Sequence, residues 1–371
     1  MNLLGVRDKI YLQYIGLPMI KINFRPFLKN IDSLPLPISD YEIIEKEKIL
    51  DCKPALYLKE DLAKVKGIAF GGSIKDEIND LNKPTYSSGP FIQYKLQNML
   101  ILKNRLYFEN YKYALNPLEK PIRFYKTKSI NQFESAAFSS MRISTCFFGH
   151  WLHEELQLID YLQGKGKIVS SSDLIGQKLE IKKLFELDFS YVPFAKIKTV
   201  EMFHGWQHTQ IQKDIFHKYK QKISKLSHVT FPKQLKIVYL ARGESGSKAN
   251  RMFLNENQLI EQLHKHYDLK RFVAESTPLL ELYSALYNAD IILGIEGSQM
   301  AHAIIAGRSG ATLLCIQPPY RFYNPFKTYC EDAKLNYAFI VADHKPNDNV
   351  FTVNINKIRQ LFDKINLSVS F

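Results

Sequence analysis

The sequence lacks the features that identify membrane-spanning and secreted proteins. It contains no uncharged apolar run of about 18 residues, the length that a membrane-spanning helix needs. The apolar residues near its N-terminus are interrupted by Arg7, Asp8 and Lys9, and no small-residue cleavage site follows, so a secretory signal is not expected. These absences predict a cytoplasmic protein that is either soluble or peripheral at the inner face of the cytoplasmic membrane.

Cysteine is scarce and shows no functional pattern. The four cysteines lie far apart and lack the spacing of metal ligands: they are Cys52, Cys146, Cys315 and Cys330. Such a distribution is typical of reduced thiols in a cytosolic protein and predicts no metal site. Zinc-finger spacing, RNP-like aromatic stretches and basic heptads are also missing, so no nucleic-acid partner is expected.

Acidic residues are fewer than basic ones, with 37 Asp and Glu against 50 Lys and Arg, a net charge of +13. This surplus favours polyanionic partners such as phosphorylated substrates or anionic lipids. Lysines recur from Lys46 to Lys66, Lys165 to Lys183 and Lys213 to Lys236, always among acidic or apolar residues. They predict solvated faces with a modest attraction to an anionic membrane surface rather than a disordered basic arm.

The length of 371 residues exceeds the size at which a single core usually stops growing, so two domains are expected. The change in sequence rhythm places their boundary between Ser227 and Lys236. We therefore predict an N-terminal domain over residues 1–230 and a C-terminal domain over residues 231–371. The terminal helix is expected to cross back to the first domain.

The second half alternates strand-like and helix-like runs. Strands are predicted at residues 235–241, 270–273, 290–293, 311–316 and 337–341, and helices at 255–266, from Pro278 through Leu286, at 298–305 and at 355–365. This alternation predicts a parallel sheet covered by helices on both faces, with ligands at the carboxyl ends of its strands. Arg242 and the segment Gly294 to Ser298 both lie at such ends.

The first half is less regular. Residues 99–108 predict a hairpin that turns near Lys103 and Asn104. A strand at 143–148, a helix at 150–162 and strands at 167–170 and 197–203 would form a second α/β alternation. The predicted fold class is therefore α/β in both halves.

The segment GHWLHEEL, residues 149–156, is the strongest candidate for catalysis. A strand ending at Phe148 would deliver His150, His153 and Glu154 to the first turn of a helix. Histidine is basic near neutrality and Glu154 lies one turn after His150, so either side chain could take a proton from a substrate hydroxyl. The alternative is that His150 only caps the helix. Glu155 points about 100° away and is expected to be solvated.

Two further groups have both a functional and a structural interpretation. Trp151 either packs in the core or stacks on a sugar. His204 and His208, four residues apart, have the spacing of a metal pair, but Gly205 between them and the lack of a carboxylate disfavour zinc. His204 and His208 follow a predicted strand, so their better functional interpretation is that they bind the acceptor substrate. Trp151 and His153 are assigned to the same acceptor site.

These motifs, taken in order, resemble one known family. GHWLHEEL, YLARG (residues 239–243), Arg251 with Asn255 and Glu256, residues 273–275 and GIEGSQ (residues 294–299) are similar to the motifs of the family 61 glycosyltransferases. The resemblance implies a GT-B-like pair of Rossmann-like domains facing a cleft, with the acceptor bound by the N-terminal domain (residues 1–230) and the nucleotide-sugar donor by the C-terminal domain (residues 231–371). It also implies an inverting, metal-independent transfer from a nucleotide sugar to a capsule or lipopolysaccharide glycan, free or lipid-linked, without a further cofactor.

The resemblance assigns roles to individual residues of the C-terminal half. Arg242 and Arg251 would grip the donor phosphates through charge-assisted hydrogen bonds, although Arg251 could instead cap the helix that begins at Asn255. Glu275 would hold the ribose or simply help to start the next helix. Gly294, Gly297 and Ser298 would form a turn whose amides and hydroxyl meet phosphate.

The sequence departs from the family pattern at Glu296, where histidine is usual, and at His302, where asparagine is usual. A carboxylate beside a diphosphate is repulsive unless it faces ribose or sugar hydroxyls. The donor therefore remains open between a UDP-sugar and a CMP-sugar such as CMP-Kdo. Ala241 and Met252 also depart from the pattern, which leaves a non-catalytic carbohydrate- or nucleotide-binding assembly protein as the alternative to an enzyme.

Overall fold

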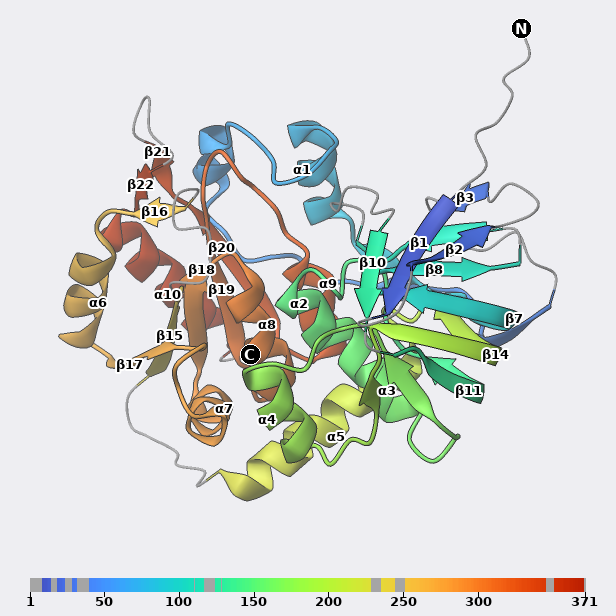
Figure 1. Cartoon of the computed structure of the whole chain (residues 1–371). Helices are drawn as coiled ribbons and strands as arrows, with labels where there is room; N and C mark the ends of the chain where they lie inside the picture. Colours follow the sequence, from blue (N-terminus) through green and yellow to red (C-terminus); the bar gives the residue numbers. More distant parts are fainter. Residues whose placement is uncertain are drawn as a thin grey trace, which may run out of the picture. The chain divides into compact units, whose positions relative to one another are not determined.

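The chain forms two compact units in a computed structural model (Figure 1), which describes residues 9–14, 19–23, 29–31, 40–109, 111–116, 124–127, 129–227, 235–243, 251–344 and 350–369. The first unit comprises Met1–Lys48 and Ser88–Thr209. The second comprises Ile49–Ser87 and Gln210–Phe371. Residues 1–8 and most of the expected linker, residues 228–234, lie outside the described residues.

The second unit contains a five-stranded parallel sheet. In spatial order its strands are β17 (Asp268–Val273), β15 (Lys236–Ala241), β18 (Ile291–Ile295), β19 (Thr312–Gln317) and β20 (Asn336–Val341). Each corresponds to a strand predicted from the sequence. Every residue of β18 and β19 is buried, as expected for strands covered on both faces.

Helices cover both faces of this sheet (Figure 1). On one face, α6 (Glu256–His264) and α10 (Ile355–Val369) share a core with the strands, in which Leu259 and Phe362 pack with Tyr239. On the other face lie α7 (Leu279–Asn288) and α8 (Ala301–Ala306), with α5 (Gln210–Leu226) and α9 (Phe326–Asp332) packed against them. The prediction of a doubly covered parallel sheet is confirmed.

The observed units differ from the expected division at residue 230. Helix α5 groups with the C-terminal residues because it packs on α7 and α8. The terminal helix α10 also stays with the second unit, since its apolar side packs on the five-stranded sheet, so the expected return to the first domain is wrong.

The segment Ile49–Ser87 belongs to the second unit because its backbone is hydrogen-bonded there. It contains β5 (Lys48–Asp51), the 3-10 helix η1 (Lys59–Lys64), α1 (Ile74–Asn82) and β6 (Thr85–Ser88). Leu56 forms a parallel bridge with Ala338, and Ile68 forms one with Phe322. A small sheet of β16 (Met252–Phe253), β22 (Val350–Thr352) and β21 (Asp343–His344) completes this unit.

The first unit is built on a nine-stranded mixed sheet. Its main path runs β13 (Ser190–Tyr191), β12 (Ile168–Ser170), β11 (Asn131–Phe138), β14 (Phe194–His204), β7 (Phe91–Leu102), β8 (Arg105–Phe108), β9 (Tyr111–Ala114) and β3 (Lys29–Ile31), and β4 (Tyr41–Glu45) pairs with β7. Strands β11 to β14 are parallel to one another, whereas β14–β7, β7–β8 and β8–β9 are antiparallel. A separate sheet joins β10 (Phe124–Thr127), β1 (Lys9–Tyr14) and β2 (Met19–Asn23). Only the four parallel strands match the Rossmann-like expectation, and the fold as a whole is mixed α/β.

Local predictions in this unit have mixed outcomes. The hairpin β7–β8 is confirmed, with Lys103 at a positive φ of 54° in its turn. The predicted strand at residues 143–148 is wrong, because the chain turns there and the strand β11 comes earlier. The hydroxyl oxygen of Ser144 accepts a hydrogen bond from the backbone N–H of Met141 at 3.1 Å, which stabilises a turn in place of a strand.

The predicted helix is present but irregular. It begins as α2 (Phe148–His150), continues as the π-helical turn η2 (Trp151–Glu155) and ends as α3 (Leu156–Tyr161). Helix α4 (Gln177–Leu184) follows β12. Single π-helical turns of this kind occur frequently at functional sites.

Candidate functional site

The carboxyl ends of β11 and β14 carry the histidines of the first unit. These strands are neighbours in register, with Phe138 opposite Met202. The strand after β11 in the chain, β12, lies on its other side, so the strand order reverses between β11 and β14. Ligands of parallel sheets bind at such switch points.

His150 and Glu154 form a hydrogen-bonded pair at this edge. Nδ1 of His150 lies 2.8 Å from Oε1 of Glu154, and the side chains are 25% and 6% exposed. Burial alone would lower the pKa of His150, but the hydrogen bond and the charge of Glu154 together outweigh burial and raise it. The pair therefore combines a partly exposed imidazole with a carboxylate that favours its protonated form.

His153 has the opposite electrostatic character. Its burial lowers its pKa to about 3, and the nearby His150 and His208 lower it further, against the attraction of Glu154. The ring centroids of His150 and His153 are 5.5 Å apart. His153 is therefore neutral near pH 7, beside a histidine whose charged form is stabilised.

The two histidines after β14 are placed differently from each other. His208 is close enough to His153 for its charge to affect the pKa of His153. His204 remains on β14 opposite Ile92, and burial lowers its pKa. Gly205 between them has a φ of +73°, and a Cβ there would collide with the carbonyl of Pro90, so the turn requires glycine. Within the described part of the chain, no three or more His, Cys, Asp or Glu side chains are arranged to hold a metal ion.

Trp151 is a core residue. Its side chain is fully buried, stacks on Phe148 at 6.1 Å and lies under the ammonium of Lys178 at 5.3 Å. The indole has no exposed face for a sugar, so the packing interpretation holds and the acceptor-stacking interpretation is wrong.

Glu155 is buried, contrary to the expectation that it is solvated. Its carboxylate accepts hydrogen bonds from four serine hydroxyls at the ends of β11 and β12: those of Ser140, Ser144, Ser170 and Ser172. These hydroxyls replace water around the charge, which makes its burial tolerable. The prediction that the Glu155 side chain points into solvent assumed a regular α-helix, whereas Glu155 is the last residue of a π-helical turn.

An arginine cluster lies at the carboxyl edge of the second unit's sheet. Arg242 follows β15 and Glu296 follows β18, and these neighbouring strands form the switch point of that sheet. Arg251 Nη1 is 3.1 Å from Glu296 Oε2 and also donates to the backbone carbonyl of Glu296, as does Arg242 at 3.3 Å. Arg321, from the loop after β19, reaches the same carboxylate at 3.6 Å.

The cluster keeps a surplus of positive charge. Burial lowers the pKa of Arg251 to about 10, and the charge of Glu296 opposes this shift while Arg242 and Arg321 add to it. Burial also lowers the pKa of Arg242. Arginine side chains are charged in proteins near neutrality, so the three guanidiniums outnumber the carboxylates of Glu296 and Glu275 that act on them, and this arrangement is suited to binding phosphate.

Two glycines of the predicted phosphate turn have different roles. A Cβ at Gly297 would lie 2.9 Å from Nη1 of Arg251 and even closer to Arg242, so glycine leaves room for both guanidiniums. Ser298, next in the chain, begins the short helix η4 (Ser298–Met300). Gly294 instead lies within β18, where a Cβ would be 2.8 Å from the carbonyl of Leu240, so it is a packing residue.

Glu275 and His302 complete the comparison with the sequence predictions. Strand β17 ends opposite Ala241, and Glu275, two residues further along the chain, lies beside Gly243 and acts by its charge on Arg242. His302 is buried in α8 with Nδ1 3.3 Å from the hydroxyl of Tyr283, and burial lowers its pKa to about 3. Arg321 was missed by the sequence analysis, although its place after a predicted strand could have indicated it.

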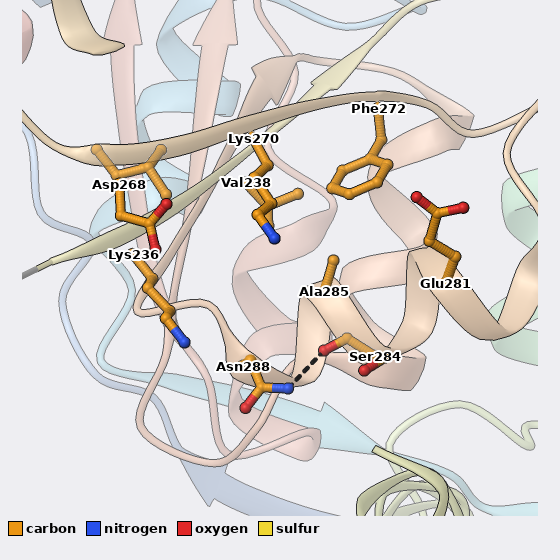
Figure 2. Close-up of a pocket in the computed structure, with 10 residues that line it drawn as sticks. Lys236, Val238, Asp268, Lys270, Phe272, Glu281, Ser284, Ala285 and Asn288 are labelled. Atoms are coloured by element: carbon orange, nitrogen blue, oxygen red, sulfur yellow. Dashed lines mark hydrogen bonds between the residues drawn. The ribbon is translucent and has the colours of Figure 1, made fainter. Parts of the chain in front are cut away.

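A pocket in the second unit contains none of the predicted site residues. This pocket of about 370 Å³ lies between β17 and α7 and is shown in Figure 2. Lys236 and Asp268 line it at the amino ends of β15 and β17, and Lys270, Glu281 and Asn288 line the remainder. Its charges are of both signs, and it is distinct from the arginine cluster at the carboxyl ends.

The fold is mixed α/β, and a cluster of arginines lies at the carboxyl edge of the parallel sheet of the second unit. Residues 148–313, somewhat less than half of the chain, match the sequence model of the family Glycosyltransferase 61, the family whose motifs the sequence resembles. The matched segment includes His150, Glu154, Arg242, Arg251 and Glu296. No curated protein matches the chain.

The chain is also similar to solved structures of a bacterial glycosyltransferase. One is the dodecameric iron-containing heptosyltransferase TibC in complex with ADP-D-beta-D-heptose, with 10% identity, a TM-score of 0.33 and coverage of 76% of this chain and 94% of that one. The other is TibC from enterotoxigenic E. coli H10407, with 11% identity, a TM-score of 0.33 and coverage of 73% and 87%. At this TM-score the similarity by itself assigns neither fold nor function.

Proposed function

We propose that this protein is an inverting, metal-independent glycosyltransferase that uses a nucleotide-sugar donor. The observation that supports this most strongly is the convergence of Arg242, Arg251 and Arg321 on one sheet edge of a chain with a family 61 segment. Three guanidiniums around a single carboxylate suit the phosphates that every nucleotide sugar carries. In this proposal the second unit takes the donor and the first takes the acceptor, as in the GT-B class.

The proposed reaction is one displacement. The oxygen of an acceptor hydroxyl forms a bond to the anomeric carbon of the donor sugar while the bond from that carbon to the phosphate oxygen breaks. The hydroxyl proton passes to the His150–Glu154 pair, and the departing nucleotide keeps the bonding electrons. Attack opposite the leaving group inverts the anomeric configuration.

The electrostatics of the two sites match the charges of this reaction. The leaving phosphate gains negative charge, which positively charged groups fixed in a partly desolvated site stabilise. At the other site, the carboxylate of Glu154 stabilises the imidazolium that forms if His150 takes the proton, as the raised pKa of His150 indicates. His153, neutral near pH 7 and next to His150, is the residue that we assign to positioning the pair for the acceptor.

The donor nucleotide and the setting are further parts of the proposal. Glu296 reduces the positive charge of the cluster but leaves it in surplus, so a UDP-sugar and a CMP-sugar such as CMP-Kdo both remain candidates. The acceptor we propose is a capsule or lipopolysaccharide glycan at the inner face of the cytoplasmic membrane, with lysines attracting the protein to anionic lipid. Among the helices that the structure describes, none is both long and apolar enough to cross a bilayer.

The test is a panel of UDP, GDP, ADP and CMP compounds, scored first by thermal stabilisation and then by transfer to glycan acceptors. A ligand that binds the folded state raises the unfolding temperature by mass action. We expect one nucleotide class to stabilise the wild type but not Arg251→Ala, and the product to have the opposite anomeric configuration to the donor. Stabilisation without transfer to any acceptor would indicate the non-catalytic binding protein instead.

A further inference from the structure

Phe70 is an exposed aromatic side chain that adjoins the arginine cluster of the second unit. Its side chain is 51% exposed. The ring centroid lies 5.3 Å from Cζ of Arg321 and 5.0 Å from the ring of Tyr323, which it meets edge to face at 75°. Arg321 also lies within ion-pair distance of Glu296, so this one side chain contacts both Phe70 and the carboxylate of the cluster.

The backbone around Phe70 is fixed to the loop that carries Arg321. The N–H groups of Lys66 and Gly67 donate to the carbonyl of Pro319 at 2.6 and 3.1 Å, and Phe322 donates back to Gly67 at 2.9 Å. A Cβ at Gly67 would lie 2.8 Å from the carbonyl of Tyr320, so glycine permits this close approach. Phe70 therefore has a defined position relative to the arginines.

The guanidinium of Arg321 has remaining capacity to bind a ligand. Its Nε is buried and makes no hydrogen bond within the described residues, although the carboxylate of Glu296 is within ion-pair distance. Its side chain is 26% exposed. It is thus held between an acidic group and an aromatic ring while it retains donors for an incoming acceptor.

A phosphate site beside a half-exposed aromatic ring has the two properties that a nucleotide recognises. Phosphates are attracted to the guanidiniums, and a planar base gains free energy by stacking on an aromatic face or on a guanidinium plane. Base stacking also tolerates different bases, because each presents a π-face. Inorganic pyrophosphate would use the arginines but has no ring that could stack on Phe70.

We propose that Phe70 and Tyr323 form the surface that receives the base of the nucleotide donor, with Arg321 linking this surface to the phosphate site. All three residues lie outside the segment that matches family 61, residues 148–313: Phe70 precedes it, and Arg321 and Tyr323 follow it. This inference rests on the proposed function, because it assigns one part of the same donor. A sugar ring stacked on Phe70, or a contact between copies of the chain, is an alternative that the test separates.

The experiment is calorimetric titration with two probes, inorganic pyrophosphate and the nucleoside phosphate that stabilises the wild type most. Phe70→Ala should weaken nucleotide binding by roughly 5- to 150-fold, the range of base stacking on an aromatic residue. Pyrophosphate affinity should change by less than about twofold, while Arg321→Ala weakens both probes. Phe70→Trp should restore nucleotide binding, since indole also stacks.

Leu280→Ala is the matched control, since it removes another exposed apolar side chain of the same unit, 56% exposed in α7. It should leave both affinities unchanged. If Phe70→Ala binds the nucleotide as tightly as the wild type does, this inference is wrong, while the proposed function stands. An equal loss of affinity for both probes would also contradict the inference, because it would mean that Phe70 only supports Arg321. If the wild type binds neither probe, the proposed donor site fails and this inference fails with it. A loss confined to self-association would likewise contradict base recognition.

Discussion

Nδ1 of His150 lies 2.8 Å from Oε1 of Glu154, across the π-helical turn that separates them. This pair is the group in the first unit best suited to accept a proton, because a buried carboxylate supports a partly exposed imidazole. His150→Ala and Glu154→Gln should each lower turnover by roughly 10²-fold or more, while donor affinity stays nearly unchanged. His266→Ala, at an exposed histidine of the second unit, is the control. Wild-type turnover in both test variants would exclude this motif from the chemistry.

The pKa of His150 gives an independent test of the same pair. Glu154 raises this pKa against the effect of burial, so Glu154→Gln should lower it below the ordinary histidine value. An NMR titration that follows the His150 ring protons measures the shift directly. The opposite direction, or no shift, would show that the hydrogen bond does not control the protonation of His150.

The arginines should contribute to nucleotide binding individually. We expect Arg242→Ala or Arg251→Ala to weaken binding by about 1.5 to 3 kcal/mol, the range for a hydrogen bond to a charged group. Arg308→Ala, which removes a half-exposed arginine paired with Asp290, should have no effect. Calorimetry that finds wild-type affinity in both cluster variants would refute a donor site on the second unit.

Glu296 should influence which nucleotide is preferred. Its carboxylate pairs with Arg251 and lies near Arg321, so replacing it with histidine removes a negative charge that a diphosphate must otherwise tolerate. Glu296→His should therefore raise the ratio of UDP affinity to CMP affinity, measured at equal ionic strength. Glu296→Gln separates the loss of charge from the change in shape. A ratio unchanged within about twofold, well under the tenfold that 1.4 kcal/mol represents, would show that Glu296 does not sense the phosphates.

Lys220 should make stability depend on pH. It is buried in α5, where its ammonium donates to the carbonyl of Ala333, and burial lowers its pKa to about 7 from the ordinary lysine value of 10.5. Between these two values the unfolded chain holds the proton and the folded chain does not. Its contribution to the free energy of unfolding therefore rises with pH from about 7 to about 10.5 and is constant below 7. Lys220→Met should flatten the pH profile of denaturant unfolding in that window, and an unchanged slope would contradict the lowered pKa.

The sequence predicted those parts of the fold whose signals are local. All five strands of the parallel sheet in the second unit were predicted, because buried parallel strands are continuous apolar runs separated by helical periodicity. The strand at residues 143–148 was wrong because the hydroxyl of Ser144 forms a turn, an interaction that an apolar pattern does not reveal. The prediction that Glu155 is solvated was wrong for a related reason, since its four serine partners come from segments that are distant in the sequence.

The candidate sites divide in the same way. His150 and Glu154 could be paired from the sequence because they are four residues apart on one helix. Arg321 and Phe70 could not be joined to Arg251, since only the folding of distant loops around the sheet edge brings them together.

The most direct test of the central claim is the release of nucleotide from a panel of UDP-, CMP-, ADP- and GDP-sugars, with and without glycan acceptors. Because water can replace the acceptor hydroxyl, the correct donor should release its nucleotide slowly even alone and faster with an acceptor. We expect one donor class to react with the wild type, while Arg251→Ala and His150→Ala lower the rate by roughly 10²-fold or more. Release that is equally fast in Arg251→Ala, or no release and no binding for any donor, would contradict the account.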